Sequence, residues 1–132
     1  MDAFDLPYPK LLEFLMRGAD DLNIIEASIR LLNRHGYWLR NREFLRFVEV
    51  FGDPPESAGI RWTEVTSALD EGRLRGDVES VNVLRISASI STFYMVSLRD
   101  VIERIGRENI KHVAEAIMYA DGFLNSVADP RP

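Results

Sequence analysis

The sequence predicts an all-α fold, a single compact bundle of six or seven helices packed orthogonally or irregularly, with the helix at about 78–95 in its centre. Apolar residues recur along most of the 132-residue chain at spacings of three and four, the period of a helix. Glycines and cap-forming residues divide this pattern into segments of helical length. Hydrophobic residues make up 46% and charged residues 28%, which is typical of a globular domain.

The first two predicted helices precede the arginine-rich middle of the chain. Residues 8–17 carry leucine and phenylalanine at helical spacing, and Gly18 is the predicted end of this helix. Asp20 or Asp21 is the predicted N-cap of the second helix. We expect that helix to end at Gly36, which adopts a left-handed conformation without a steric cost.

The next pair of predicted helices is separated by a proline-containing loop. Asn41 is the predicted cap of a helix over residues 42–51, whose apolar residues share one face and which ends at Gly52. Residues 52–57 contain two consecutive prolines, which disfavour helix before them and indicate a loop. A fourth helix is expected over residues 60–71.

The fifth predicted helix, residues 78–95 with Asp77 as its cap, is the longest. One apolar row runs from Val81 to Met95, and a second row includes Ile86. Two such rows are typical of a central helix that other helices of the same chain surround. The alternative is a helix shared across a homodimer interface, where the second row meets its symmetry mate.

Two further helices complete the predicted bundle. Ser97 and Asp100 have the form of a capping box that opens a helix directly after Ser97. The final helix is expected over residues 108–121. The proline-rich residues 129–132 are predicted to form a frayed tail, so that the single helical domain spans residues 1–128.

The composition excludes several classes of protein. The chain has no cysteine, which excludes disulfides, zinc–thiolate sites and cysteine nucleophiles. Its apolar runs are far shorter than the roughly 20 residues that cross a bilayer, and its acidic start lacks the features of a signal peptide. We therefore expect a soluble, cytoplasmic protein with no membrane partner. The net charge of −5 disfavours nucleic acid as a partner without excluding it.

Motifs of catalysis and metal binding are absent from the sequence. His35 and His112 are far apart, and neither has the spacing of a metal ligand. The sequence contains no nucleotide-binding glycine loop, serine elbow or calcium loop. We predict a protein that is not an enzyme and that has no catalytic residue, metal or cofactor.

Basic residues cluster in the middle of the chain. Five arginines and one glutamate lie between residues 30 and 47, a net charge of +4 between acidic neighbours. The candidate partner-binding residues of this arginine island are Tyr37, Trp38, Arg40, Arg42 and Arg46. The simplest interpretation is that the aromatic rings plug the end of the core and the arginines pair with acidic helices. The sharper interpretations are a protein interface, or a phosphate-and-stacking surface for nucleic acid.

A helix-turn-helix is the alternative that the spacing allows. Ala68 and Gly72 supply the small residue and the glycine that its first helix and turn need. Its candidate nucleic-acid contacts are Arg61, Arg73, Arg75 and Arg85. The linker after the first helix is longer than the usual turn, and the second helix is apolar on most of its circumference. The match is therefore weak.

These observations predict a non-enzymatic interaction or regulatory protein that binds another protein through helix surfaces and forms a homodimer. The alternative is a DNA-binding regulator of the helix-turn-helix kind. A third interpretation is a small-molecule binder with a pocket lined by Trp62, Phe93 and Tyr94. A short, arginine-rich, cysteine-free helical chain is compatible with a bacterial or phage origin.

Overall fold

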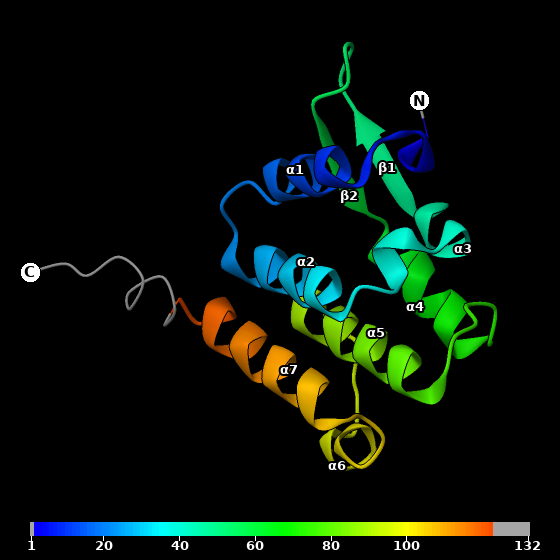
Figure 1. The fold of residues 1–132 in the computed structure, drawn as a ribbon, viewed down its shortest axis with the longest axis vertical. Helices are drawn as coiled ribbons and strands as arrows, with labels where there is room; N and C mark the ends of the chain where they lie inside the picture. Colours follow the sequence, from blue (N-terminus) through cyan, green and yellow to red (C-terminus); the bar gives the residue numbers. More distant parts are fainter. Residues whose placement is uncertain (1, 123–132) are drawn as a thin grey trace, which may run out of the picture.

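A computed structural model describes residues 2–122 as a mostly helical fold with one small sheet (Figure 1). In chain order its elements are the 3-10 helix η1 (Ala3–Asp5), α1 (Tyr8–Gly18), α2 (Asn23–His35), the 3-10 helix η2 (Trp38–Arg40), α3 (Arg42–Leu45), β1 (Val48–Phe51), β2 (Ser57–Ile60), α4 (Trp62–Asp70), α5 (Val78–Ser91), α6 (Leu98–Ile102) and α7 (Arg107–Ala120). The predicted helical character is confirmed, whereas all-α is not an exact description because the chain also forms two short strands. The predicted tail, residues 129–132, lies outside the described residues.

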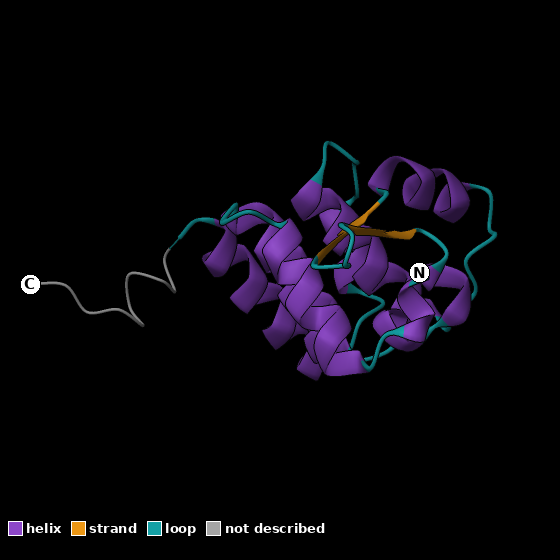
Figure 2. Cartoon of the chain, turned by 90° about the horizontal axis from the view of Figure 1, so that it is seen from above, coloured by secondary structure: helices purple, strands orange, loops and turns teal. Residues whose placement is uncertain are grey.

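The sheet is an antiparallel hairpin of β1 and β2 (Figure 2). At its open end Val48 lies opposite Ile60, and next to the turn Phe51 lies opposite Ser57. The turn begins at Gly52, whose φ of 102° is a conformation that only glycine adopts readily. The two consecutive prolines follow, so the loop predicted from them connects two strands rather than two helices.

The helix predicted over residues 42–51 is therefore wrong in its second half. Its first half forms α3, which ends at Leu45. Beyond that point Val48 is buried, Glu49 is exposed and Val50 is half-buried, which is the alternation of a strand. The β-branched valines pack well on a pleated surface, and the pairing with β2 satisfies their backbone groups.

Several predicted helix ends are found where the sequence places them. Asn41, Asp77 and Ser97 each accept a hydrogen bond from the backbone N–H three residues later, at 2.9, 2.7 and 3.5 Å. Gly36 ends α2 with a φ of 87°. These local hydrogen bonds need no tertiary contact, which is why the sequence alone indicates them.

Two other predicted ends are wrong. Leu22, rather than Asp20 or Asp21, precedes the first turn of α2. The two aspartates instead form the turn between α1 and α2, with φ angles of 52° and 61° that aspartate tolerates better than most residues. Helix α5 ends at Ser91, before the predicted end at residue 95.

Gly18 is the last residue of α1, and it allows this helix to lie directly against β2 (Figure 1). A Cβ atom on Gly18 would stand 1.9 Å from the carbonyl oxygen of Ala58. Such a distance is far inside van der Waals contact, so the packing of α1 on the hairpin requires a glycine here.

The buried apolar side chains of residues 2–122 form two clusters. The larger has eighteen residues and fills the space between α1, α2, η2, the hairpin, α4 and α5. The smaller has seven residues and lies between α2, α5, α6 and α7. Neighbouring residues of the same helix contribute to different clusters, Leu32 and Leu31 from α2 and Leu84 and Val83 from α5. Helices α2 and α5 are thus the layer that joins the two halves.

Candidate functional site

The two aromatic residues of the arginine island seal the end of the larger cluster. Trp38 is completely buried, and its indole N–H donates to the backbone carbonyl of Ser80 at 2.7 Å. Tyr37 packs edge-on against it, with ring centroids 4.8 Å apart, and donates from its hydroxyl to the carbonyl of Arg75 at 3.0 Å. Trp38 therefore presents no surface to a partner, and only the outer edge of Tyr37 does.

Two arginines of the island stack on aromatic rings of the N-terminal segment. The guanidinium carbon of Arg40 lies 3.9 Å from the centroid of Tyr8, and that of Arg42 lies 4.9 Å from the centroid of Phe4. Burial raises the pKa of the Tyr8 phenol, although the nearby charge of Arg40 opposes this. These cation–π contacts attach η1 and the start of α1 to the rest of the fold.

The fifth arginine of the island lies in an open groove of about 810 Å³. Arg46 lines this groove together with Arg73 and Arg75, which we predicted from the sequence to be nucleic-acid contacts. Acidic neighbours compensate two of the three charges, because Glu43 lies 3.7 Å from Arg46 and Glu71 lies 2.6 Å from Arg73. Within residues 2–122 no ion pair includes Arg75, so the groove offers one uncompensated arginine rather than a concentrated basic surface.

The remaining arginines of the predicted nucleic-acid surface are also paired within the chain. Arg61 forms an ion pair with Glu64 at 3.2 Å in the first turn of α4. Arg85 lies 3.6 Å from Asp70 and donates a hydrogen bond to the hydroxyl of Tyr94. These contacts neutralise charges that a phosphate backbone would otherwise attract.

Helix α5 is the second helix of the predicted helix-turn-helix, and it is enclosed by the rest of the chain. None of its residues after Val78 is fully exposed, and seven of them are buried. A recognition helix has to present a face to the major groove. The geometry of α5 is therefore that of a core helix.

The three residues predicted to line one small-molecule pocket lie apart. Trp62 lines a hollow of about 220 Å³ beside the end of α1. Phe93 is completely exposed, and Tyr94 donates its hydroxyl hydrogen to Asp70 at 2.7 Å. The structure does not bring these side chains into one cavity.

A polar network that the sequence analysis did not find joins α2, α5 and the start of α7. One ring nitrogen of His35 lies 3.1 Å from the hydroxyl of Ser80, and the other lies 3.1 Å from the side-chain oxygen of Asn109. The side-chain nitrogen of Asn109 donates to Glu79 at 2.7 Å, and the backbone N–H of Gly106 donates to the same carboxylate oxygen at 2.7 Å. These residues are spread along the sequence at spacings that carry no local signal.

The donors and acceptors of this network fix which ring nitrogen carries the proton in the neutral imidazole. Glu79 only accepts, so Asn109 turns its amide nitrogen to Glu79 and its oxygen to His35. Nδ1 of His35 therefore carries the proton, and Nε2 accepts from the Ser80 hydroxyl. Serine, histidine and amide in this order also occur in nucleophilic sites. Ser80 keeps only 4% of its surface exposed, however, which leaves a substrate no access to its oxygen.

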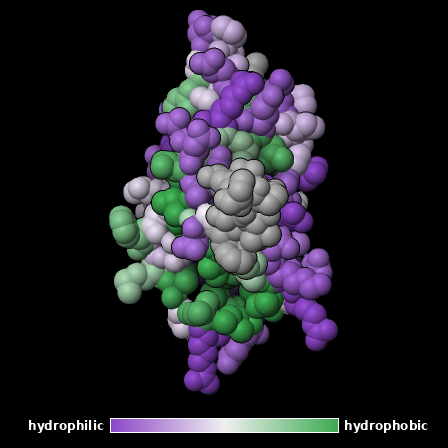
Figure 3. All heavy atoms as spheres, turned by 90° about the vertical axis from the view of Figure 1, so that its left-hand side faces the viewer, coloured by the Kyte–Doolittle hydropathy of each residue, from purple (hydrophilic) through white to green (hydrophobic). Residues whose placement is uncertain are grey.

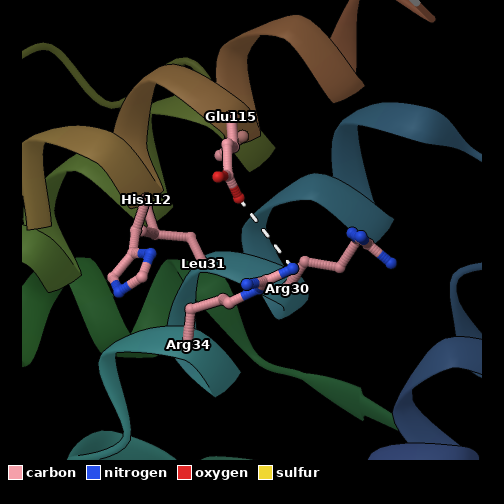
Figure 4. A pocket seen from close by; sticks show the side chains of 6 residues that line it. Arg30, Leu31, Arg34, His112 and Glu115 are labelled. Carbon is pink, nitrogen blue, oxygen red and sulfur yellow. Dashed lines mark ion pairs between the residues drawn. The ribbon is translucent and has the colours of Figure 1, made fainter. Parts of the chain in front are cut away.

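The hollow drawn in Figure 4 lies between α2 and α7 and is lined by Arg30, Leu31, Arg34, His112 and Glu115, with Ala116. An ion pair of 3.9 Å between Arg34 and Glu115 crosses it. Its volume of about 10 Å³ is that of roughly one water-sized sphere. This site is too small for an organic ligand.

One unexplained feature of the surface is apolar. Four large side chains on the α5–α6 connection and on α6 are exposed to solvent, and we call them the α6 apolar surface: Phe93, Met95, Leu98 and Ile102. Phe93 is completely exposed, and the other three keep 91%, 59% and 49% of their surface. Figure 3 shows hydrophobic side chains gathered in the lower half of the molecule on the face that this view presents.

Neither a metal site nor a membrane span is found within residues 2–122. No group of three or more His, Asp and Glu side chains there is arranged to hold a metal ion. None of the helices in this part of the chain has the length and hydrophobicity needed to cross a bilayer. Neither a protein-family model, nor a curated protein, nor a solved structure matches this chain. The geometry of the chain itself therefore carries the functional argument.

Proposed function

We propose that this chain is a non-enzymatic interaction module that binds other proteins through the α6 apolar surface. The observation that carries the proposal is the run of large apolar side chains between residues 93 and 102 that the fold leaves in water. Burial of apolar surface is worth about 25 cal/mol per Å². A partner that covers these side chains gains that free energy without any rearrangement of the core.

The surroundings of the arginine island support this choice of surface. Trp38 is enclosed, and Arg40 and Arg42 are engaged with rings of the same chain. The side chains of the α6 apolar surface differ in this respect, because solvent rather than protein covers most of their area. We therefore place the interface on α6 rather than on the island.

DNA binding has less support as an alternative. Arg61, Arg73 and Arg85 are each in an ion pair with a neighbouring carboxylate. The chain as a whole carries a net charge of −5, which repels a phosphate backbone. A helix-turn-helix would also need α5 to leave the core.

Site-specific photocrosslinking in the cell of origin tests the proposed function. The full chain is produced with benzoylphenylalanine, a photoreactive analogue of phenylalanine, in place of Phe93. The matched control carries it in place of Phe51, which is also exposed but lies on the hairpin at the opposite end of the molecule (Figure 1). We expect discrete crosslinked protein adducts when the probe is at position 93. The same adducts should be absent when the probe is at position 51. No adduct from position 93, or the same adducts from both positions, would contradict the proposal.

A further inference from the structure

Among residues 2–122, the α6 apolar surface belongs to the half of the molecule with the smaller buried cluster. The smaller cluster has seven buried residues against eighteen in the larger one, and α6 contributes only Val101 to it. Helix α6 has five residues, and a helix this short owes its stability to packing rather than to its own hydrogen bonds. Leu98 and Ile102 are one turn apart on α6, and both point away from the cluster.

We propose that a second copy of this chain occupies the α6 apolar surface, packed about a two-fold axis. This inference rests on the proposed function and names its partner. In a two-fold interface the same surface meets itself, so each residue on one copy faces the equivalent region of the other. The charges around the surface must then be compatible with themselves.

The charged residues around α6 meet this condition. Four basic residues and three acidic residues are interspersed here, and all seven side chains are exposed: Arg99, Asp100, Glu103, Arg104, Arg107, Glu108 and Lys111. Within residues 2–122 no ion pair includes Asp100 or Arg104, so each is available to an opposite charge on the partner copy. A rim with basic and acidic side chains in nearly equal numbers allows opposite charges to face each other when two copies meet.

Two other segments of the chain do not meet this condition. The segment between residues 30 and 47 has five arginines and one glutamate and would repel a second copy of itself. The segment between residues 48 and 72 is correspondingly acidic, with six carboxylates and one arginine. Self-association through the α6 apolar surface is thus favoured by both its hydrophobicity and its charge pattern.

Sedimentation velocity of the full chain over a range of concentrations tests the proposal. We expect a dimer that dissociates on dilution, and a monomer or at least about a tenfold weaker dimer when Phe93→Ser and Met95→Ser are combined. The matched control combines Phe51→Ser with Val78→Ser, which removes exposed apolar side chains elsewhere and should leave the dimer unchanged. All the substituted side chains are solvent-exposed, so circular dichroism should show an intact fold in both double variants.

A charge exchange shows whether α6 meets α6. One variant combines Arg99→Glu with Arg104→Glu and has an acidic rim, and the other combines Asp100→Lys with Glu103→Lys and has a basic rim. We expect each variant alone to be monomeric, because its rim repels itself. An equal mixture of the two variants should form a mixed dimer. Native mass spectrometry detects it as a species whose mass is the sum of one chain of each variant.

The two proposals fail in different ways. A wild-type chain that stays monomeric up to about 0.5 mM, or a dimer that the Phe93 and Met95 substitutions leave unchanged, would overturn the second copy as occupant. The absence of a mixed dimer would overturn it equally. In each case the proposed function still stands if position 93 crosslinks to a different protein, and it falls only if position 93 gives no specific adduct.

Discussion

At the scale of single residues, His35 shows how neighbours determine the charge of a side chain. Burial lowers the pKa of its imidazole, and hydrogen bonding to Asn109 and the charges of Asp77 and Glu79 oppose this only in part. In its neutral form the ring satisfies both Ser80 and Asn109. Protonation would reverse the hydrogen bond to Ser80, whose hydroxyl oxygen would then accept from Nε2–H.

We predict a pH-dependent stability that originates at His35. The unfolded chain binds a proton at this histidine near pH 6.5, whereas the folded chain resists it, so the unfolded state gains protons first as the pH falls. The free energy of unfolding should therefore decrease between about pH 7.5 and 5.5. Urea unfolding followed by tryptophan fluorescence measures it, and His35→Gln should flatten the profile in this window. An unchanged slope in the variant would contradict the assignment.

Carboxylates contribute in a separate, more acidic window. Hydrogen bonds from Asn109 and Gly106 lower the pKa of Glu79, and the hydrogen bond from the Ser80 backbone N–H lowers that of Asp77. Because these groups release their protons more readily in the folded state, their contribution to stability is present above about pH 4.5 and is lost below it. The two windows can thus be separated in one titration.

Trp38 and Arg40 illustrate what residue types alone do not decide. They are two positions apart in the same 3-10 helix, yet the indole is enclosed and the guanidinium lies over the ring of Tyr8. The composition of the segment fits an exposed interface as well as it fits a plug. Which of these side chains is buried depends on the orientation of η2 relative to α1 and α5. That orientation belongs to the tertiary structure.

At the scale of elements, the hairpin shows where sequence periodicity is ambiguous. Phe44, Phe47, Val48 and Phe51 follow helical spacing, whereas Val48 and Val50 follow the alternation of a strand. The segment adopts the strand because β2 provides a partner for its backbone. That partner lies beyond a proline-containing turn, which helical spacing does not take into account.

Packing of α1 on the hairpin gives a prediction about Gly18. Gly18→Ala should lower the free energy of unfolding by about 1–3 kcal/mol, because the new methyl group would overlap the carbonyl oxygen of Ala58 and push the two elements apart. Thermal or urea unfolding measures the change. Gly59→Ala is the matched control in the adjoining strand, where a Cβ atom would lie 3.4 Å from the Phe51 ring. Equal effects of the two substitutions would contradict the close approach.

Helix α7 receives its cap from another element. Its N-cap is Gly106, which has no side chain to satisfy the first backbone N–H groups. Glu79 of α5 accepts from Gly106 and from Asn109 in the first turn, and its negative charge is favourable at a helix N-terminus. The sequence places the start of α7 within one or two residues, but a cap from a residue this distant leaves no local pattern.

At the scale of the whole molecule, the two apolar clusters are joined through α2 and α5. Leu31 belongs to the smaller cluster and Leu32 to the larger one, although they are adjacent in α2. Both are almost completely buried. Loss of either side chain should therefore affect a helix that both halves need.

We predict that the two halves unfold together. Leu31→Ala should lower the free energy of unfolding by about 2–5 kcal/mol, and Leu32→Ala should do the same. The fluorescence of Trp38 and Trp62 reports on the larger cluster, and far-ultraviolet circular dichroism reports on all helices. We expect both signals to give the same midpoint in each variant. A fluorescence midpoint that Leu31→Ala leaves unchanged would show that the halves unfold independently.

The α6 apolar surface was hidden in the sequence by an incorrect helix end. Phe93 and Met95 fit the two apolar rows of a helix over 78–95, which predicts them to be buried. Helix α5 ends at Ser91, and the following residues leave the core with these side chains exposed. Because α5 ends early, two residues that the sequence predicts to lie in the core become part of the α6 apolar surface.

The sequence by itself determined the helical character of the chain, most of its helix positions and several caps, because periodicity and capping depend on residues three or four positions apart. The tertiary structure decided the hairpin, the burial of Trp38, the pairing of the arginines, the His35 network and the exposure of Phe93 and Met95. Each of these depends on which distant segment lies opposite a given residue. The packing of α2 and α5 between the two clusters decides which segments lie opposite each other. No local sequence pattern indicates this arrangement.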